Sequence, residues 1–241
     1  VAFTATIPNP GPGRRFRGGR QPTVTGTFNN DDRDREILEL GGRAGIKYSG
    51  NWKAFVQATA NQRDYDSGQD DFGFRRDSTG VEGAVGLSWT LPRRLQWEML
   101  VGYMKQNYDD PALPDVSTID YGTELSWRPI DGTRVAAYVQ RSLEETTQPG
   151  ASSYLYTVSG AQLRHVVTGR LQVTARASYG QTNYQGVNRE DDLIGIGGSL
   201  QYYFYRQIYV EPDYQFTSRQ SNLAGGDYQR SRAFLYLGME L

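Results

Sequence analysis

The sequence contains no cysteine and a single histidine, His165. Without cysteine, the chain forms neither a disulfide framework nor a thiolate metal site. A hydrolase of the Ser–His–acid type needs its histidine among clustered polar groups. We expect His165 beside a short turn, at the end opposite the polar loops, and interpret it as an interface residue. We therefore predict no catalytic residue, no metal site and no cofactor, and we expect that the chain is not an enzyme.

Glycine-rich phosphate-binding loops are also missing. The GPG and GG segments of this chain are typical of turns. Three aspartate pairs, at 70–71, 109–110 and 191–192, fall in predicted loops. A calcium site there is conceivable, but their spacing matches no known calcium loop. Solvated acidic loops are the expected explanation for these pairs.

Long apolar runs are absent, and no segment approaches the roughly 20 apolar residues of a membrane helix. No basic-then-apolar signal pattern opens the chain, so the numbering of an exported protein is expected to start after processing. Hydrophobic residues make up 37% and mean hydropathy is -0.64, yet aromatics reach 12%. Low hydropathy combined with many strands is typical of a transmembrane barrel with a polar lumen. The net charge of -1 gives no bulk attraction to nucleic acid, so no nucleic-acid partner is expected.

The stretch Val81–Tyr108 shows the pattern that the rest of the chain repeats. Apolar residues alternate with small or polar residues along VEGAVGLSWT and again along LQWEMLVGYMKQNY, and LPRR joins the two arms. A period of two indicates strands, because successive side chains leave a strand on opposite faces. The stretch is therefore a predicted hairpin with one apolar face.

Short turns recur near residues 50, 92, 131, 169 and 206, with two long strands in each period. Propeller blades hold four short strands in such a period, so an antiparallel barrel is favoured. We predict an all-β, transmembrane, antiparallel up-and-down β-barrel of about 12 strands over residues 23–241, with short periplasmic turns and longer extracellular loops. Its first strand is the weak segment Thr23–Phe28, and residues 1–22 form an irregular segment rich in Pro, Gly and Arg. Pro212 falls in mid-strand, where a bulge or kink is expected.

The apolar face is expected to meet lipid, since many Ala and Gly residues on it would fill a soluble core poorly. A soluble β-domain, with this face inside, is the alternative. Aromatic residues are predicted to lie at the two membrane interfaces, where such residues form girdles. They are Tyr48, Trp89, Trp97, Tyr103, Tyr121, Trp127 and Tyr179.

The opposite face carries charges of both signs, which need water or a partner. The predicted pore-lining residues are Arg43, Arg63, Glu82, Glu98, Glu124, Arg134, Arg176, Glu211, Asp213 and Arg232. Two interpretations remain open: a hydrated pore, or a salt-bridged interior that closes the barrel. Twelve strands lie between the filled eight-stranded barrels and the open 16–18-stranded ones, so size does not decide.

The segments DRDREILELGGRAGIKYSGNWKAFVQATANQRDYD and YRQIYVEPDYQFTSRQSN, with the ending RAFLYLGMEL, carry a resemblance over roughly residues 30–241. They resemble the porin-like outer-membrane β-barrel family associated with bacterial exopolysaccharide and capsule export loci. Its members are often longer than this chain. The ending Gly238–Leu241 lacks the final aromatic residue usual in outer-membrane barrels. The resemblance implies a Gram-negative outer-membrane location and a conduit or partner role in polysaccharide secretion.

Three functional hypotheses follow. The first is a pore or conduit for solutes or secreted polysaccharide. The second is a structural barrel with a non-conducting lumen that anchors a periplasmic or secretion assembly, with residues 1–22 as the contact. The third, an outer-membrane enzyme, is the weakest because of His165. The expected partners are outer-membrane lipid, lipopolysaccharide and a periplasmic export or assembly protein, and no pattern indicates an oligomeric state.

Overall fold

The structure is a computed structural model, and it describes residues 34–146, 148–205 and 207–239. These residues form an all-β chain whose strands are 12–16 residues long, as the alternation predicts. The strands are β1 Arg35–Ser49, β2 Trp52–Tyr65, β3 Ser78–Leu91, β4 Leu95–Tyr108, β5 Val116–Trp127, β6 Thr133–Glu145, β7 Ser153–Thr168, β8 Leu171–Gln185, β9 Glu190–Tyr203, β10 Ile208–Ser221 and β11 Tyr228–Met239. The described ranges hold no helix long and apolar enough to cross a membrane.

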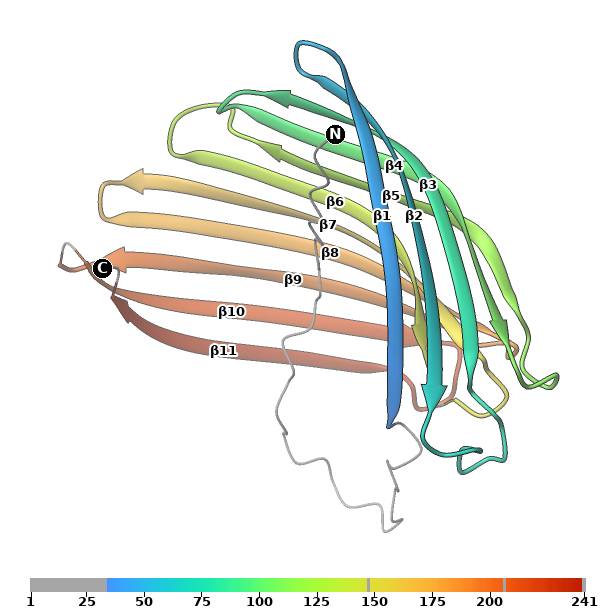
Figure 1. Ribbon diagram of the computed structural model, residues 1–241. Coiled ribbons are helices and arrows are strands. Elements are labelled where there is room, and N and C mark those ends of the chain that lie inside the picture. Colours follow the sequence, from blue (N-terminus) through green and yellow to red (C-terminus); the bar gives the residue numbers. More distant parts are fainter. Residues whose placement is uncertain (1–33, 147, 206, 240–241) are drawn as a thin grey trace.

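Each strand pairs antiparallel with its sequence neighbours, in the order β1 to β11, and the sheet is strongly twisted and curved (Figure 1). The prediction of an up-and-down meander is confirmed. The prediction of a closed barrel of 12 strands is wrong for the described residues. They form 11 strands, and β1 and β11 pair on one side only. The predicted first strand, Thr23–Phe28, and the segment 1–22 lie outside the described residues.

Connections of two kinds alternate along the meander, as predicted. Segments near residues 50, 92, 131, 169 and 206 join strands at one end of the sheet, here called the turn end. Segments 66–77, 109–115, 146–152, 186–189 and 222–227 join strands at the other, the loop end. A bulge or a kink is expected at Pro212. The residue interrupts the pairing of β10 with β9 but causes no register shift, so a bulge is absent. Proline has no backbone N–H, so one ladder hydrogen bond is lost, but no extra residue is inserted into the strand.

The two faces of the sheet differ in chemistry. On the convex face Leu40 is 78% exposed and Leu237 75% exposed, and aliphatic side chains dominate its middle. Trp52 stacks on Trp89 at a ring separation of 5.6 Å and meets Trp97 edge-on at 6.4 Å, near the turn end. The tryptophans Trp89 and Trp97 therefore lie outside any closed core. A soluble fold would bury such a face, whereas lipid accommodates it.

The sheet folds onto itself at the loop end. Pairing of β5 with β6 is confined to Gly122–Trp127 and Val135–Gln140. Beyond this point β6 and β7 lie over the concave face of the first strands, where Leu143 and Leu155 pack against Met104 and Val116. Leu143 and Leu155 continue the apolar row of their strands, so the expectation that they face lipid is wrong. Their row meets a second protein layer instead.

Aromatic rings of the concave face lie over glycines of neighbouring strands. A side chain at Gly86 would place its Cβ 2.1 Å from Phe55 Cζ, and one at Gly160 would meet the Tyr138 ring at 2.7 Å. These glycines let rings lie flat against the strand backbone, which supports the register of neighbouring strands. Phe55 is accordingly buried although it belongs to the polar face.

This packing predicts that Gly86→Val destabilises the fold by about 1–3 kcal/mol, because the added side chain overlaps the Phe55 ring. Urea unfolding of the detergent-folded protein, followed by tryptophan fluorescence, measures the loss. Gly83→Val is the matched control, since Gly83 lies on the same strand with nothing within 4 Å of an added Cβ. Equal stability of the two variants would contradict the packing argument.

Candidate pore lining and rim contacts

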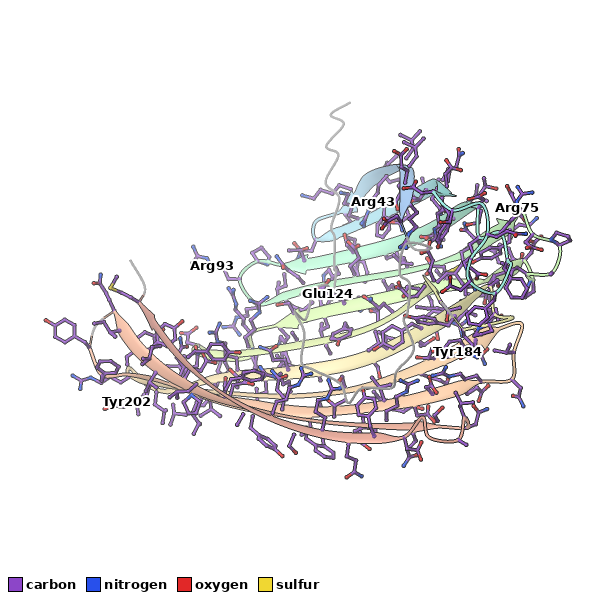
Figure 2. The ribbon with its side chains drawn as sticks, turned by 90° about the horizontal axis from the view of Figure 1, so that it is seen from below. Arg43, Arg75, Arg93, Glu124, Tyr184 and Tyr202 are labelled. Atoms are coloured by element: carbon purple, nitrogen blue, oxygen red, sulfur yellow. The ribbon has the colours of Figure 1, made fainter. Side chains whose placement is uncertain are left out.

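A cavity of about 540 Å³, here called the central cavity, lies on the concave face of β2–β6 and β1. Five of the predicted pore-lining residues belong to its wall: Arg43, Arg63, Glu82, Glu98 and Glu124. Period-two alternation places them there, because each sits on the face opposite the aliphatic row of its strand. Figure 2 shows Arg43 and Glu124 among the side chains of this half of the sheet.

Arg43 and Glu98 bridge two strands that are not neighbours. Arg43 Nη2 lies 2.8 Å from Glu98 Oε2, and the Arg43 guanidinium stands 3.3 Å from the centre of the Phe55 ring. Both side chains are more than a third exposed, so water screens the pair and its contribution to stability is small. Its effect is geometric, since it fixes two opposite charges within the cavity.

The remaining predicted pore-lining residues lie elsewhere. Arg176 donates to Asp213, and Gln215 Nε2 donates to the other oxygen of Asp213 at 3.0 Å. Glu211 and Arg232 lie on the same concave face of β10 and β11. Arg134 lies at the turn end, where its Nε donates to Ser126 Oγ at 3.2 Å. The predicted set thus shares one face, but the structure divides it into separate groups.

Ion pairs tie the folded-over end of β6 to the first two strands. Glu145 lies 2.8 Å from Arg35 Nη2 and 3.3 Å from Arg63 Nη1. Arg141 Nη1 donates to Thr118 Oγ1 at 3.3 Å, where the β5–β6 ladder is missing. Sequence reasoning missed Arg35, Arg141 and Glu145. Their contacts arise where the pairing of β5 with β6 is interrupted. The alternation of apolar and polar residues does not indicate such an interruption.

A second buried ion pair secures the longest loop. Arg76 Nε donates to Asp70 Oδ2 at 2.6 Å, and its Nη1 donates to the carbonyls of Thr146 and Ala151 at 2.8 and 3.2 Å. Asp70 also accepts the backbone N–H groups of Phe72 and Phe74. Its side chain is 4% exposed. The loop 66–77 is therefore docked on the β6–β7 connection.

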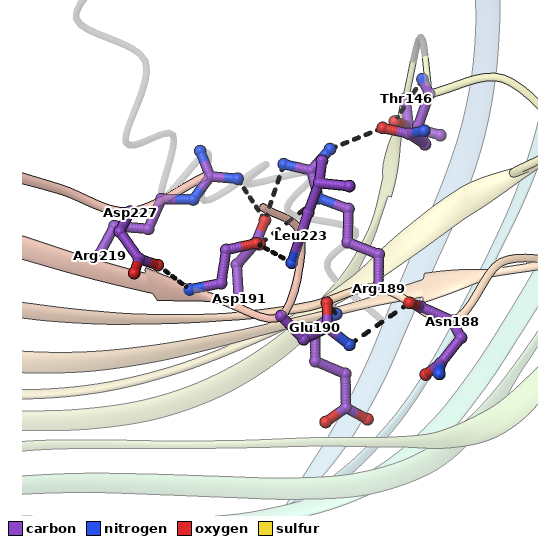
Figure 3. Close-up of polar contacts among 11 residues, drawn as sticks. Thr146, Asn188, Arg189, Glu190, Asp191, Arg219, Leu223 and Asp227 are labelled. Atoms are coloured by element: carbon purple, nitrogen blue, oxygen red, sulfur yellow. Dashed lines mark hydrogen bonds and ion pairs between the residues drawn. The ribbon is translucent and has the colours of Figure 1, made fainter. Parts of the chain in front are cut away.

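A third cluster joins the loops of the last strands (Figure 3). Asp191, 2% exposed, accepts hydrogen bonds from Arg189 and Arg219. Arg189 Nη1 also donates to Gln148 Oε1 at 2.6 Å. Asn222 Oδ1 accepts the backbone N–H of Glu190 at 3.0 Å. One buried carboxylate thereby organises the loops after β8 and β10.

The loop aspartates act as turn acceptors. The Asp110 carboxylate accepts the backbone N–H groups of Arg75 at 2.8 Å and Ala112 at 2.9 Å. These bonds favour the charged form and lower the pKa of Asp110 below its ordinary value. The described residues show no group of His, Cys, Asp or Glu side chains that could hold a metal ion.

Charge is distributed unequally along the strand axis. Figure 2 shows Arg93 and Tyr202 at the turn end and Arg75 and Tyr184 at the loop end. The described loop segments carry eight aspartates against three arginines. The described turn segments carry Arg93, Arg94, Arg128 and Arg170 against the single carboxylate of Asp131. The turn end is therefore basic and the loop end acidic.

The predicted interface aromatics lie on the convex face. Tyr48 is 84% exposed, and Tyr103, Trp127 and Tyr179 are also exposed, while Trp89, Trp97 and Tyr121 are half-buried. Sequence reasoning missed Trp52, although it begins the apolar row of Ala54 and Val56. The position of His165 at the turn end is as predicted, and its Nδ1 lies 2.8 Å from Thr133 Oγ1.

A family model described as putative beta-barrel porin 2 matches residues 16–241. The chain belongs to this family. Membership and the meander of long strands identify a porin-like, membrane-embedded β-barrel protein. They do not show the association with exopolysaccharide loci that the sequence resemblance implies. Among curated proteins, none matches this chain.

Solved structures with a similar fold include the copper transporter OprC, with a TM-score of 0.57 and 12% identity. The match covers 86% of this chain but 41% of that transporter. The NanC porin is matched at a TM-score of 0.40 and 11% identity, over 86% of this chain and 96% of the porin. LpxR from Salmonella typhimurium is matched at a TM-score of 0.34 and 10% identity, over 87% of this chain and 90% of LpxR. Of these three matches, the one to OprC supports the fold.

The loop cluster of this porin-family chain predicts that Asp191→Asn loosens the loops 186–189 and 222–227. The variant leaves two partly buried arginines without their carboxylate partner. Breaking a fully buried ion pair lowers stability by about 3–5 kcal/mol, and the loss is smaller here because the arginines are partly exposed. Limited proteolysis with trypsin should then cut after Arg189 at least several-fold faster. Asp192→Asn is the matched control, because Asp192 lies on the other face of β9, where it accepts the Tyr179 hydroxyl. Unchanged cleavage in both variants would contradict the role of Asp191.

Proposed function

We propose that this protein is an outer-membrane pore that conducts small polar solutes. The observation that carries the proposal is the central cavity, a charged concave space on a sheet whose convex face is apolar. Outer-membrane lipid and lipopolysaccharide are the proposed surroundings of the convex face. The predicted pore-lining residues are proposed to line the path of the solute.

The central cavity favours cations. Arg43 pairs with Glu98, and Arg63 pairs with Glu145, so these arginines are neutralised in place. The other carboxylates in the wall are those of Glu39, Glu82, Asp120 and Glu124. The other two cations of the wall are Lys105 and Arg141, and the Arg141 guanidinium donates hydrogen bonds to Thr118 and Thr157. Excess negative charge in a narrow space raises the local concentration of cations.

Passage of a secreted polysaccharide is the finer form of this proposal, and it rests on the family resemblance. A polysaccharide needs a wide path from the turn end to the loop end. The loop ends of β6 and β7 lie over the concave face of β1–β5, which narrows that path. Small solutes are therefore the substrate class that the geometry supports best.

The proposal predicts a cation-selective conductance in planar bilayers. The double variant Glu82→Gln/Asp120→Asn removes two neighbouring wall carboxylates, so the permeability ratio of K⁺ to Cl⁻ should fall by about twofold or more. The reversal potential under a KCl gradient measures this ratio.

Glu36→Gln provides the control, because it removes a carboxylate from the convex face of β1, and the ratio should stay unchanged. A double variant that matches the wild-type ratio would show that these carboxylates do not line the path. A folded, heat-modifiable protein that carries no current would overturn the pore proposal.

A structural barrel that anchors a periplasmic assembly is the second candidate. The observation favouring it is the folded-over loop end, where Met104, Val116 and Leu155 form a small core and Arg76 is 7% exposed. A protein with this core in the path would carry little current. The proposed contact for the assembly, residues 1–22, lies outside the described residues.

The Glu145 ion pairs distinguish the two candidates. Glu145→Gln releases Arg35 and Arg63 and should let the end of β6 move away from the concave face. In a pore, the single-channel conductance should rise. Arg75→Gln, which breaks an exposed 3.9 Å pair outside the cavity, should leave it unchanged. If the wild type and the Glu145→Gln variant are both folded and neither carries current, the result would favour the structural candidate.

A further inference from the structure

The turn end contains a second cavity, separate from the central cavity that carries the pore proposal. Its volume is about 970 Å³, and five arginines contribute to its wall, with Asp131 as the carboxylate of the lining. We call it the arginine pocket. Its arginines are Arg93 and Arg94 from the β3–β4 turn, Arg128 from the β5–β6 turn, Arg134 from β6 and Arg164 from β7.

Ion pairs within the described part of the chain do not neutralise these guanidinium groups. Among the residues that the structure describes, none of the five lies within 4.0 Å of a carboxylate oxygen. By contrast, Arg43, Arg63 and Arg176 of the concave face each have a carboxylate partner. The contrast separates the pocket from the charged lining of the central cavity.

Two features of the arginine pocket destabilise the folded protein. Arg134 and Arg164 stand directly opposite each other on β6 and β7, and like charges in this position repel. Arg93 has φ +64°, a left-handed conformation, in a turn closed by the Arg94 N–H donating to the Leu91 carbonyl at 3.1 Å. Glycine is favoured at such a turn position, because a Cβ there is strained. Strained and repelling groups that persist together are typical of binding sites.

We propose that the arginine pocket binds a small soluble polyanion, a molecule carrying two or more phosphate, sulfate or carboxylate groups. Guanidinium groups bind these groups through paired, charge-assisted hydrogen bonds, and several of them can share one ligand. Binding a polyanion relieves the repulsion between Arg134 and Arg164. The proposal does not require that the barrel conducts.

The position of the pocket favours a soluble anion over a lipid headgroup. Arg134 and Arg164 lie on the face of β6 and β7 that carries Gln162, opposite the row of Val135 and Leu163. Leu163 belongs to the exposed apolar face that we assign to lipid. A lipid phosphate would lie beside that apolar row, whereas these two arginines extend from the other side of the strands.

Isothermal titration calorimetry tests the proposal with the full chain folded in neutral detergent at about physiological salt. The probes are inorganic tripolyphosphate and citrate, which present phosphate and carboxylate groups respectively. Arg134→Gln and Arg164→Gln should each weaken binding of the better probe about tenfold, as expected for the loss of a charge-assisted contact. Arg170→Gln is the matched control, because it removes the same charge from a turn-end residue outside the pocket and should change the affinity less than about twofold.

Arg93→Gly separates binding from folding. It should raise the melting temperature, because glycine accepts the positive φ without strain, and it should still weaken binding several-fold. A heat-modifiable band on gels confirms that each variant is folded. Retained affinity in folded Arg134→Gln and Arg164→Gln would overturn the proposal.

Three further outcomes would also overturn it. The first is that neither probe binds the wild type. The second is equal weakening by Arg170→Gln and Arg134→Gln, which would reveal diffuse surface charge without a defined site. The third is that phosphatidylglycerol, added to the micelles, displaces the probes and binds with the same dependence on Arg134, which would assign the pocket to a lipid headgroup.

Discussion

Inside a bilayer no water is present to bond the backbone, so each N–H and C=O group must find its partner within the protein. Most features of this chain depend on that constraint. The antiparallel ladder from β1 to β11 supplies partners along long strands, and the ladder in turn imposes a period of two on the side chains. In the described strands the apolar row then forms the convex face and the polar row the concave face, with no helix and no hydrophobic core of ordinary size.

The interruption of the ladder between β5 and β6 shows how polar side chains replace it. Where β5 and β6 separate, Arg141 and the ion pairs of Glu145 connect β6 to the first strands. The buried Arg76–Asp70 pair anchors the loop above them. These contacts turn the loop end of an open sheet into a two-layered structure, and they narrow the concave space at the end that would be extracellular in a porin-like barrel.

Alternation was sufficient to predict the strands, the faces and the two kinds of connection, because each follows from local residue order. The predicted pore-lining residues Glu82, Glu98 and Asp213 could be placed on one face for the same reason. Alternation could not predict that Leu143 and Leu155 would pack on Met104, since an apolar row looks the same whether lipid or protein covers it. The arginine pocket was also missed, because its members are separated in sequence by up to 71 residues and meet only through the meander.

The prediction of a closed barrel of 12 strands extrapolated from the spacing of the short turns and from an even number of strands. Each local pairing can be correct while the two ends of the sheet remain apart, because closure depends on the accumulated twist of all strands. The family match and the OprC likeness agree with the kind of sheet that the alternation predicts. The OprC likeness extends over less than half of that longer chain.

The opposed charges of the turn end and the loop end have an electrical consequence. In a conducting barrel, fixed arginines concentrate mobile anions at one mouth, and fixed carboxylates concentrate mobile cations at the other. One polarity of voltage drives both populations into the lumen, and the reverse polarity drains them. The molecule would then behave as a diode, so its two orientations in a membrane could be told apart from the sign of its rectification.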